Sequence, residues 1–293
     1  MTENNAIRET KRHGLINFPF EVYRCKIPET FPFFPMHYHE EFEIVFMLEG
    51  ILDCQINIEH FICREGDILV IPPGKVHGFN QFENKTCHYA NILFSLNLLE
   101  KEDSEIFATF FKPYLTDSFK ISNYFPKNSD ENRLLYDSVL TLFVKRHEEL
   151  TEPLLIKSEL YKIMSVLQKL ALPADTHLSK SERNIKRLMP VFEAIRKNPA
   201  KAMSVQDAAS LSNFSESYFM NVFKQVSGTS FINYLKKTRL ENARVMLLGT
   251  DMSILEIAEN SGFESVSYFI RAFKESYNFS PLQYRKSMAL KQL

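Results

Sequence analysis

The chain has 293 residues, of which 45% are hydrophobic and 24% charged, and its formal net charge at pH 7 is −1. This length favours two domains, and this composition supplies each with apolar side chains for a core, which excludes a largely disordered protein. No run of about 18 apolar residues occurs and the polar start lacks the apolar stretch of a signal peptide, so we expect a cytoplasmic protein without membrane contact.

The small net charge hides an uneven distribution along the chain. Residues 183–293 contain 16 Lys and Arg against 9 Asp and Glu, a net charge of +7, whereas the first 182 residues contain 19 against 27, a net charge of −8. A basic C-terminal part is typical of a nucleic-acid-binding domain, although solvated helices are often equally basic. The cysteines lack C-x-x-C spacing, so we interpret them as reduced core thiols. They are Cys25, Cys54, Cys63 and Cys87.

Short apolar runs alternate with turn residues from Val22 to about Leu99. Runs such as FEIVFML, CQINI and DILVI are typical of strands, and Gly50, Gly66 and the Pro-Pro-Gly stretch at 72–74 are typical of the turns between strands. Many short strands at this spacing predict a β-sandwich or a β-barrel.

Two motifs in this region carry potential ligand side chains. The first is His37-x-His39-x3-Glu43, followed by a glycine, and the second ends at His77. In an extended strand His37 and His39 point to one face, and the spacing keeps Glu43 on that face. Both motifs resemble those of the cupin fold, with their spacing intact. The resemblance implies a cupin-like β-barrel in which the four side chains converge, with His77 opposite the other three.

The apolar period becomes helical from Asp103 onward. Helices are predicted within 104–115, 129–150 and 152–172. The last has a broad apolar stripe, which either forms an interface between two chains or packs on the barrel of its own chain. The stripe includes Leu160, Met164 and Leu167.

A polar segment with Pro173 and Ser179 separates these helices from the C-terminal part. Proline is tolerated near the first turn of a helix, so Pro190 places the start of the next helix near Met189. We therefore expect an N-terminal domain at 1–175, a linker at 176–188 and a C-terminal domain at 189–293.

The C-terminal part contains one helix-turn-helix pattern twice. The second copy, SILEIAENSGFESVSYFIRAFK from Ser253, repeats the first copy, SVQDAASLSNFSESYFMNVFK from Ser204, with an offset of 49 residues before the turn and 50 after it. A repeat of this kind is one supersecondary unit used twice. A helix within 238–249 is predicted to join the two units.

Together with RLENARVMLL and SPLQYR, these motifs resemble the DNA-binding domain of the AraC family of bacterial transcription regulators. Asn213 and Asn278 stand where that family often has glycine, and asparagine tolerates the left-handed backbone that glycine would supply. The predicted fold class is α+β with two domains: a cupin-like β-barrel with trailing helices, then an all-α domain with two helix-turn-helix motifs.

The second helix of each unit is the predicted recognition helix, which enters the major groove. Arg271 suits the edge of a guanine, Asn221 that of an adenine, and Met220 a thymine methyl group. Lysine side chains and the amides at the helix starts suit phosphates. The predicted DNA contacts are Ser215, Ser217, Met220, Asn221, Lys224, Ser265, Ser267, Ile270, Arg271 and Lys274.

The AraC resemblance implies a regulator that binds double-stranded DNA as a homodimer, meets RNA polymerase, and responds to a small molecule in the barrel. Three imidazoles and a carboxylate suit Zn, Fe, Mn or Ni, but AraC-type regulators commonly keep this pattern while binding an organic effector. We therefore favour an uncharged sugar, because the acidic domain has no basic cluster near the motifs to neutralise an anion. No cofactor is expected, and a divalent metal at the four residues is the alternative.

The competing function class is a metal-dependent cupin enzyme, or a metal sensor, fused to a DNA-binding domain. Cupins with a His-His-Glu-His set include such enzymes, but the sequence offers no further acid–base constellation. We therefore expect no catalytic residues and no enzyme activity.

Overall fold

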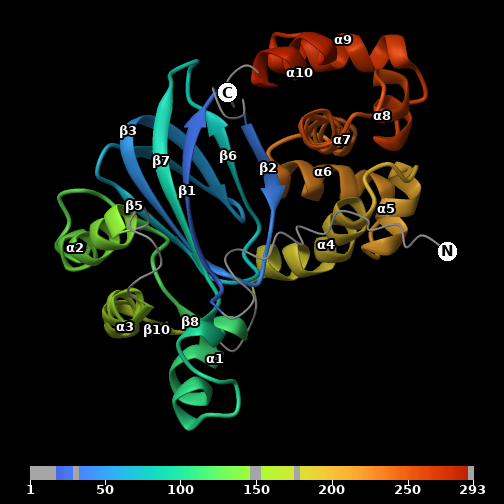
Figure 1. Cartoon of the computed structure of the whole chain (residues 1–293). Helices are drawn as coiled ribbons and strands as arrows, with labels where there is room; N and C mark the ends of the chain where they lie inside the picture. Colours follow the sequence, from blue (N-terminus) through green and yellow to red (C-terminus); the bar gives the residue numbers. More distant parts are fainter. Residues whose placement is uncertain (1–17, 29–32, 146–152, 175–178, 290–293) are drawn as a thin grey trace. The chain divides into compact units, whose positions relative to one another are not determined.

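A computed structural model describes residues 18–28, 33–145, 153–174 and 179–289 (Figure 1). They form two compact units: a sensor unit, which extends to residue 174, and a helical unit, which begins at Ser179. No helix among the described residues is long and apolar enough to cross a membrane. The end of the predicted helix 129–150 and the start of the predicted linker lie outside the described residues.

The sensor unit is built on an eight-stranded sheet, whose described pairings are antiparallel. Its main path runs β1-β7-β3-β5-β9, while β2 pairs with β6, and β4 and β6 pair with β3. The strands are β1 (Phe20–Ile27), β2 (Phe33–His37), β3 (Phe42–Ile56), β4 (Glu59–Arg64), β5 (Ile68–Ile71), β6 (His77–Gln81), β7 (Cys87–Phe94) and β9 (Tyr124–Phe125).

Strand β3 belongs to both halves of this sheet. Its first half pairs with β5 and β7, and its second half pairs with β4 and β6. Between the halves lies Gly50, whose φ is +81° and where a Cβ atom would collide with the backbone of Thr86. Only glycine fits this conformation and this close approach, so Gly50 lets one strand serve both halves.

The two faces of the sheet carry different cores. Phe42 and Ile44 of β3 point into a core shared with α2 (Asp130–Lys145) and α3 (Pro153–Leu170). Figure 1 shows these two helices beside the sheet. Val45 and Met47 point to the other side, into a cluster called the inner core below. The inner core comprises Cys25, Ile27, Val45, Met47, Leu52, Cys54, Ile56, Cys63, Leu69, Ile71, Phe79, Cys87 and Tyr89.

All four cysteines are buried, and none forms a disulfide, as the sequence predicted. Burial raises the pKa of the Cys54 thiol well above its usual value and that of the Cys87 thiol to about 11. A thiol with a raised pKa stays protonated near neutral pH, which suits a core residue rather than a redox sensor.

The remaining elements of the sensor unit connect the sheet to its helices. A turn of π-helix (Phe107–Phe111) leads into α1 (Lys112–Leu115), and a small second sheet pairs β8 (Phe119–Lys120) with β10 (Leu172–Pro173).

The helical unit begins with α4 (Lys180–Lys197), so the predicted start near Met189 was wrong, and residues 180–188 are helix rather than linker. A capping box fixes the start: Ser179 Oγ accepts from the Glu182 N–H, and Glu182 Oε2 accepts from the Ser179 N–H. Pro190 forfeits one hydrogen bond inside the helix, and the buried face of α4 offsets this cost. That face contains Ile185, Leu188, Val191, Phe192 and Ile195.

Two helix-turn-helix units follow, as predicted. In the first, α5 (Val205–Leu211) precedes α6 (Glu216–Ser227), and in the second, α8 (Ile254–Asn260) precedes α9 (Val266–Tyr277). Matching helices have equal lengths, 7 and 12 residues, which confirms the internal repeat. They are joined by α7 (Phe231–Gly249), which begins earlier than the sequence predicted because Ser230 caps it, and α10 (Pro281–Ala289) ends the unit.

The turns and cores of the two units also match the prediction. Asn213 and Asn278 have φ values of 54° and 61°, the left-handed conformation expected of them. The phenylalanines of α6 and α9 are core residues with exposures of 0%. They are Phe219, Phe223, Phe269 and Phe273.

Candidate functional site

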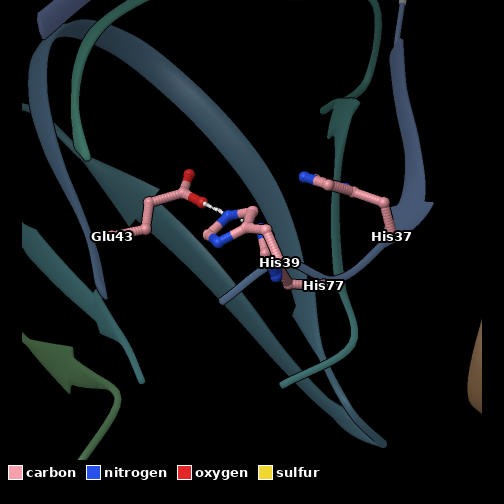
Figure 2. A group of neighbouring side chains, drawn as sticks. All are labelled: His37, His39, Glu43 and His77. Carbon is pink, nitrogen blue, oxygen red and sulfur yellow. Dashed lines mark hydrogen bonds and ion pairs between the residues drawn. The ribbon is translucent and has the colours of Figure 1, made fainter. Parts of the chain in front are cut away.

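Four side chains from three parts of the sensor unit meet at one point. His37 ends β2, His39 lies in the turn after it, Glu43 belongs to β3 and His77 begins β6. One potential ligand atom of each lies within 4.8 Å of the others. Figure 2 shows the His37 ring pointing toward the other three side chains. The sequence placed the same four residues together, and they are called the His/Glu cluster below.

Hydrogen bonds fix the orientation of two imidazoles in the cluster. His39 Nδ1 lies 3.1 Å from the carbonyl oxygen of Glu41, and His77 Nδ1 lies 2.8 Å from that of Lys75. A carbonyl oxygen only accepts, so each Nδ1 carries the proton. The Nε2 atoms of both rings therefore face Glu43 Oε2, at 2.7 Å from His39 and 2.9 Å from His77.

The cluster is buried at three of its four positions. His39, Glu43 and His77 are 7%, 1% and 0% exposed, while His37 is half-buried. Burial alone would raise the pKa of Glu43, but the imidazoles of His77 and His39 more than reverse this effect and hold the pKa well below its usual range. Glu43 is therefore a carboxylate, and one buried oxygen, Oε1, has no hydrogen-bond partner.

A carboxylate lone pair and two Nε2 lone pairs cannot share this space without positive charge between them. Either a ring is protonated or a cation binds, because lone pairs at 2.7–2.9 Å repel. His77 Nε2 is also without a well-aligned hydrogen bond. The donor set thus fits a divalent cation, which His37, His39, Glu43 and His77 would hold.

The inner core, which extends behind the cluster, is aliphatic, aromatic and thiol-bearing. Nearby aromatic and histidine side chains lie in different parts of the unit. Phe79 lies beside His77, with ring centroids 5.8 Å apart, but Phe46 packs on Tyr136 of α2 on the other face of the sheet. His88 pairs with Glu49, at 3.2 Å.

The ten predicted DNA contacts all lie on the exposed side of their helices, opposite the buried phenylalanines. The hydroxyls of Ser215 and Ser265 accept from the N–H groups of Tyr218 and Tyr268, which caps α6 and α9. These two serines therefore act first as helix caps. Met220 and Ile270 are 49% and 37% exposed, so both apolar side chains are accessible to a partner molecule.

Several arginines that raise the net charge of the C-terminal part form hydrogen bonds within the helical unit. Arg187 Nε donates to the Ser212 carbonyl, Arg239 Nε to that of Pro199, and Arg285 Nε to that of Leu247. These side chains hold loops within the helical unit, which the sequence analysis missed. A count of charges cannot distinguish these arginines from arginines that contact phosphates. Their role depends on where a distant carbonyl oxygen lies in the folded chain.

The apolar stripe of α3 packs on its own chain. Leu160, Met164 and Leu167 are 0%, 4% and 0% exposed and share the core of Phe42 and Ile44 on the sheet. These residues are intrachain core, so the second interpretation of the stripe, packing on its own chain, is the correct one for Leu160 and Leu167. The helix pair presents other apolar side chains to solvent, namely Leu134, Val144 and Leu154.

Each of the two units matches a known protein family. Residues 26–164 match the family of AraC-like ligand binding domains, and residues 208–287 match a helix-turn-helix domain family. YdeC, an uncharacterized HTH-type transcriptional regulator of Bacillus subtilis, is 23% identical over 289 residues, 96% of this chain and 96% of that protein. An uncharacterized HTH-type transcriptional regulator of Haemophilus influenzae is 36% identical over 105 residues, 36% of this chain and 35% of that protein. The structure of ToxT from Vibrio cholerae aligns over 91% of this chain and 97% of its own, at 14% identity with a TM-score of 0.47.

A sheet-rich unit with a ligand-binding family match and a helical unit with two helix-turn-helix motifs define a ligand-responsive DNA-binding protein. The chain belongs to the AraC family of transcriptional regulators. That family consists of transcription regulators rather than enzymes, which confirms the expected function class.

Proposed function

We propose that this regulator senses a divalent transition-metal ion held by the His/Glu cluster. The observation that carries the proposal is the placement of two buried Nε2 atoms, of His39 and His77, against Glu43 Oε2. Their Nδ1–H groups donate to backbone carbonyls, the arrangement that orients metal-binding histidines. Imidazole and carboxylate ligands suit Zn, Mn, Fe or Ni, and such an ion would also satisfy Glu43 Oε1.

An uncharged sugar in a cupin-like barrel is the second candidate effector. The net charge of −8 over the first 182 residues favours a neutral or cationic ligand over an anion. A sugar needs several polar side chains around its hydroxyl groups, whereas the rings packed against His37 and His77 include those of Phe34 and Phe79. The cluster geometry therefore ranks the metal ion above the sugar, which reverses the preference drawn from the sequence.

The proposed DNA interface is formed by α6 and α9, within a DNA-binding domain that starts at Ser179. In each helix the exposed side chains next to the buried phenylalanines would read base edges, and the lysines one turn later would contact phosphates. Arg271 and Asn221 are the proposed base readers with bidentate geometry, and Lys224 and Lys274 the phosphate contacts.

Assembly as a homodimer is proposed to use the outer surface of α2 and α3. Leu134, Val144 and Leu154 are 61%, 53% and 83% exposed, whereas the inner faces of the same helices pack on the sheet. Two-fold assembly would let two copies bind paired half-sites. At a promoter, the dimer would lie within reach of RNA polymerase, its other proposed partner.

Metal analysis of the full chain, purified without chelator, tests the proposed effector. We expect near-stoichiometric Zn, Mn, Fe or Ni, and its loss in His39→Ala and Glu43→Gln. The matched control is His60→Ala, because His60 is half exposed on β4 and pairs with Asp53, away from the cluster. Metal retained equally in all variants would place the ion elsewhere.

A second measurement separates the two candidate effectors. Saturation at about 100 times the dissociation constant adds about 2.7 kcal/mol to the free energy of unfolding, so a binding ligand raises the melting temperature. We expect this shift with Zn²⁺ or Mn²⁺ and its absence in His39→Ala. A protein purified without metal and stabilised only by a carbohydrate would support the sugar instead.

A further inference from the structure

The loop between β5 and β6 contacts two histidines of the cluster at once. The N–H of Gly74 donates to the carbonyl oxygen of His39 at 2.8 Å, and the carbonyl oxygen of Lys75 accepts from His77 Nδ1 at 2.8 Å. The position of this loop therefore sets where the His77 ring points, because the ring follows the acceptor of its N–H group.

An ion pair fixes the same loop to a distant part of the sensor unit. Lys75 Nζ lies 2.7 Å from Asp117 Oδ1, and the side chains are 27% and 35% exposed. Asp117 follows α1 and has a φ of +54°, a left-handed conformation that is uncommon outside glycine. Surrounding contacts must hold a residue in such a conformation, so the turn at Asp117 is well defined.

The turn at Asp117 also holds the end of the sensor unit. The carbonyl oxygen of Ser118 accepts from the N–H of Ala174 at 2.9 Å, and β8, which follows, pairs Lys120 with Leu172. Ala174 is the last described residue before 175–178, after which Ser179 caps α4. The turn at Asp117 thus contacts two segments. One is the loop that orients His77, and the other is the end of β10, which precedes the DNA-binding domain in the sequence.

We propose that the Lys75–Asp117 ion pair couples occupation of the His/Glu cluster to the path of the chain at Ala174. The inference rests on the proposed function, because it takes the cluster as the effector site. A ligand that draws His77 into a fixed position acts on the Lys75 carbonyl through the Nδ1–H bond. The Lys75 side chain transmits the resulting shift of the loop to Asp117. The Ser118 carbonyl oxygen, next to Asp117, transmits the shift to the N–H of Ala174. Lys75 and Asp117 are positioning residues, since neither belongs to the cluster.

Hydrogen–deuterium exchange of the full chain, with and without Zn²⁺, tests this coupling. In the wild type we expect Zn²⁺ to slow exchange in the peptide that contains Ala174. In Asp117→Asn and Lys75→Gln the slowing should be lost, while Zn²⁺ affinity, measured by calorimetry, falls only about two- to fivefold, the range of partly exposed ion pairs. Asparagine tolerates the left-handed conformation at 117, so Asp117→Asn removes charge without adding strain.

Three comparisons make the result specific. Glu65→Gln breaks another exposed ion pair of the sensor unit, Glu65 with Lys127 at 3.3 Å, and should leave the Zn²⁺-dependent slowing intact. Lys75→Arg should restore it, and the double variant should behave like either single variant, because both remove the same contact.

The failures are distinguishable from one another. Zn²⁺ binding with undiminished slowing at Ala174 in Asp117→Asn would overturn the coupling and leave the proposed function standing. A wild type that binds none of Zn²⁺, Mn²⁺, Fe²⁺ and Ni²⁺ would instead remove the proposed function and the coupling together.

Discussion

Tyr218 and Tyr268 occupy equivalent positions at the starts of the two recognition helices, but their surroundings differ. The hydroxyl of Tyr218 accepts a hydrogen bond from Asn184 Nδ2 of α4, at 3.2 Å. Tyr268 is 42% exposed, and the guanidinium carbon of Arg271 lies 5.5 Å from the centroid of its ring. The two units therefore share a fold but present different surfaces, since α4 contacts Tyr218 in the first unit and Arg271 lies beside Tyr268 in the second.

Arg271 and Lys274 are expected to contribute differently to DNA binding. Arg271→Ala should relax specificity at one base pair and cost about 1–3 kcal/mol of binding free energy, because it removes a bidentate base contact. Lys274→Ala should weaken all sequences alike. Fluorescence anisotropy with DNA selected from a random library, and with single-base variants of it, measures both effects. Equal losses on selected and random DNA for Arg271→Ala would exclude it from base reading.

Substitutions on the two sides of the α2–α3 helix pair should differ in their effect on stability and on assembly. Leu160→Ala should lower the free energy of unfolding by about 2–5 kcal/mol, because this side chain is fully buried. Leu134→Asp should change stability by no more than about 0.5 kcal/mol, as expected of an exposed position. If the outer surface forms the dimer interface, the double variant Leu134→Asp/Leu154→Asp should be a folded monomer. Analytical ultracentrifugation measures its mass in solution. A folded dimer in that double variant would place the interface elsewhere.

Glu159 makes the stability of the helix pair depend on pH. Burial would raise the pKa of Glu159, but hydrogen bonds from Lys162 and from Ser138 of α2 reverse this effect and lower it. The folded-state pKa lies below that of the unfolded chain, about 4.3. Glu159 therefore contributes stability that is present above that value and is lost as the pH falls through the lowered pKa.

Glu159→Gln should accordingly reduce the loss of melting temperature between pH 7 and pH 3. Thermal unfolding followed by circular dichroism at both pH values measures the difference. Asp130→Asn is the matched control, because Asp130 is an exposed carboxylate on the neighbouring helix. An equal pH dependence in wild type and Glu159→Gln would show that the buried contacts do not shift the titration.

Gly262 should be the least replaceable glycine of the helical unit. Its φ is +82°, and an added Cβ atom would lie 2.6 Å from the carbonyl oxygen of Ala200. Gly262→Ala is expected to cost about 1–3 kcal/mol through backbone strain, and more if the loop cannot move. Gly249→Ala is the control, because nothing lies near its Cβ position and alanine favours a helix by about 0.5–1 kcal/mol. Equal melting temperatures for the two variants would contradict this account.

The sequence by itself determined the features that depend on local spacing. Left-handed asparagines and the repeated helix-turn-helix pattern are encoded within a few residues, so Asn213 and Asn278 could be assigned directly. The four residues of the cluster were also found from motif spacing. Strand alternation does not explain the position of His39, however, because His39 lies in a turn beyond β2. The fold of that turn brings His39 to Glu43.

Only the tertiary structure decided which of two surfaces a side chain meets. The apolar stripe with Leu160 fits a dimer or a core equally well by periodicity, and the packing of α3 on the sheet settled it as core. Pro190 suggested a helix start, yet the capping box at Ser179 and the buried face of α4 place it mid-helix. The ion pair of Lys75 with Asp117 joins residues 42 positions apart, and no local pattern encodes such a contact, because its energy depends on how distant turns are brought together.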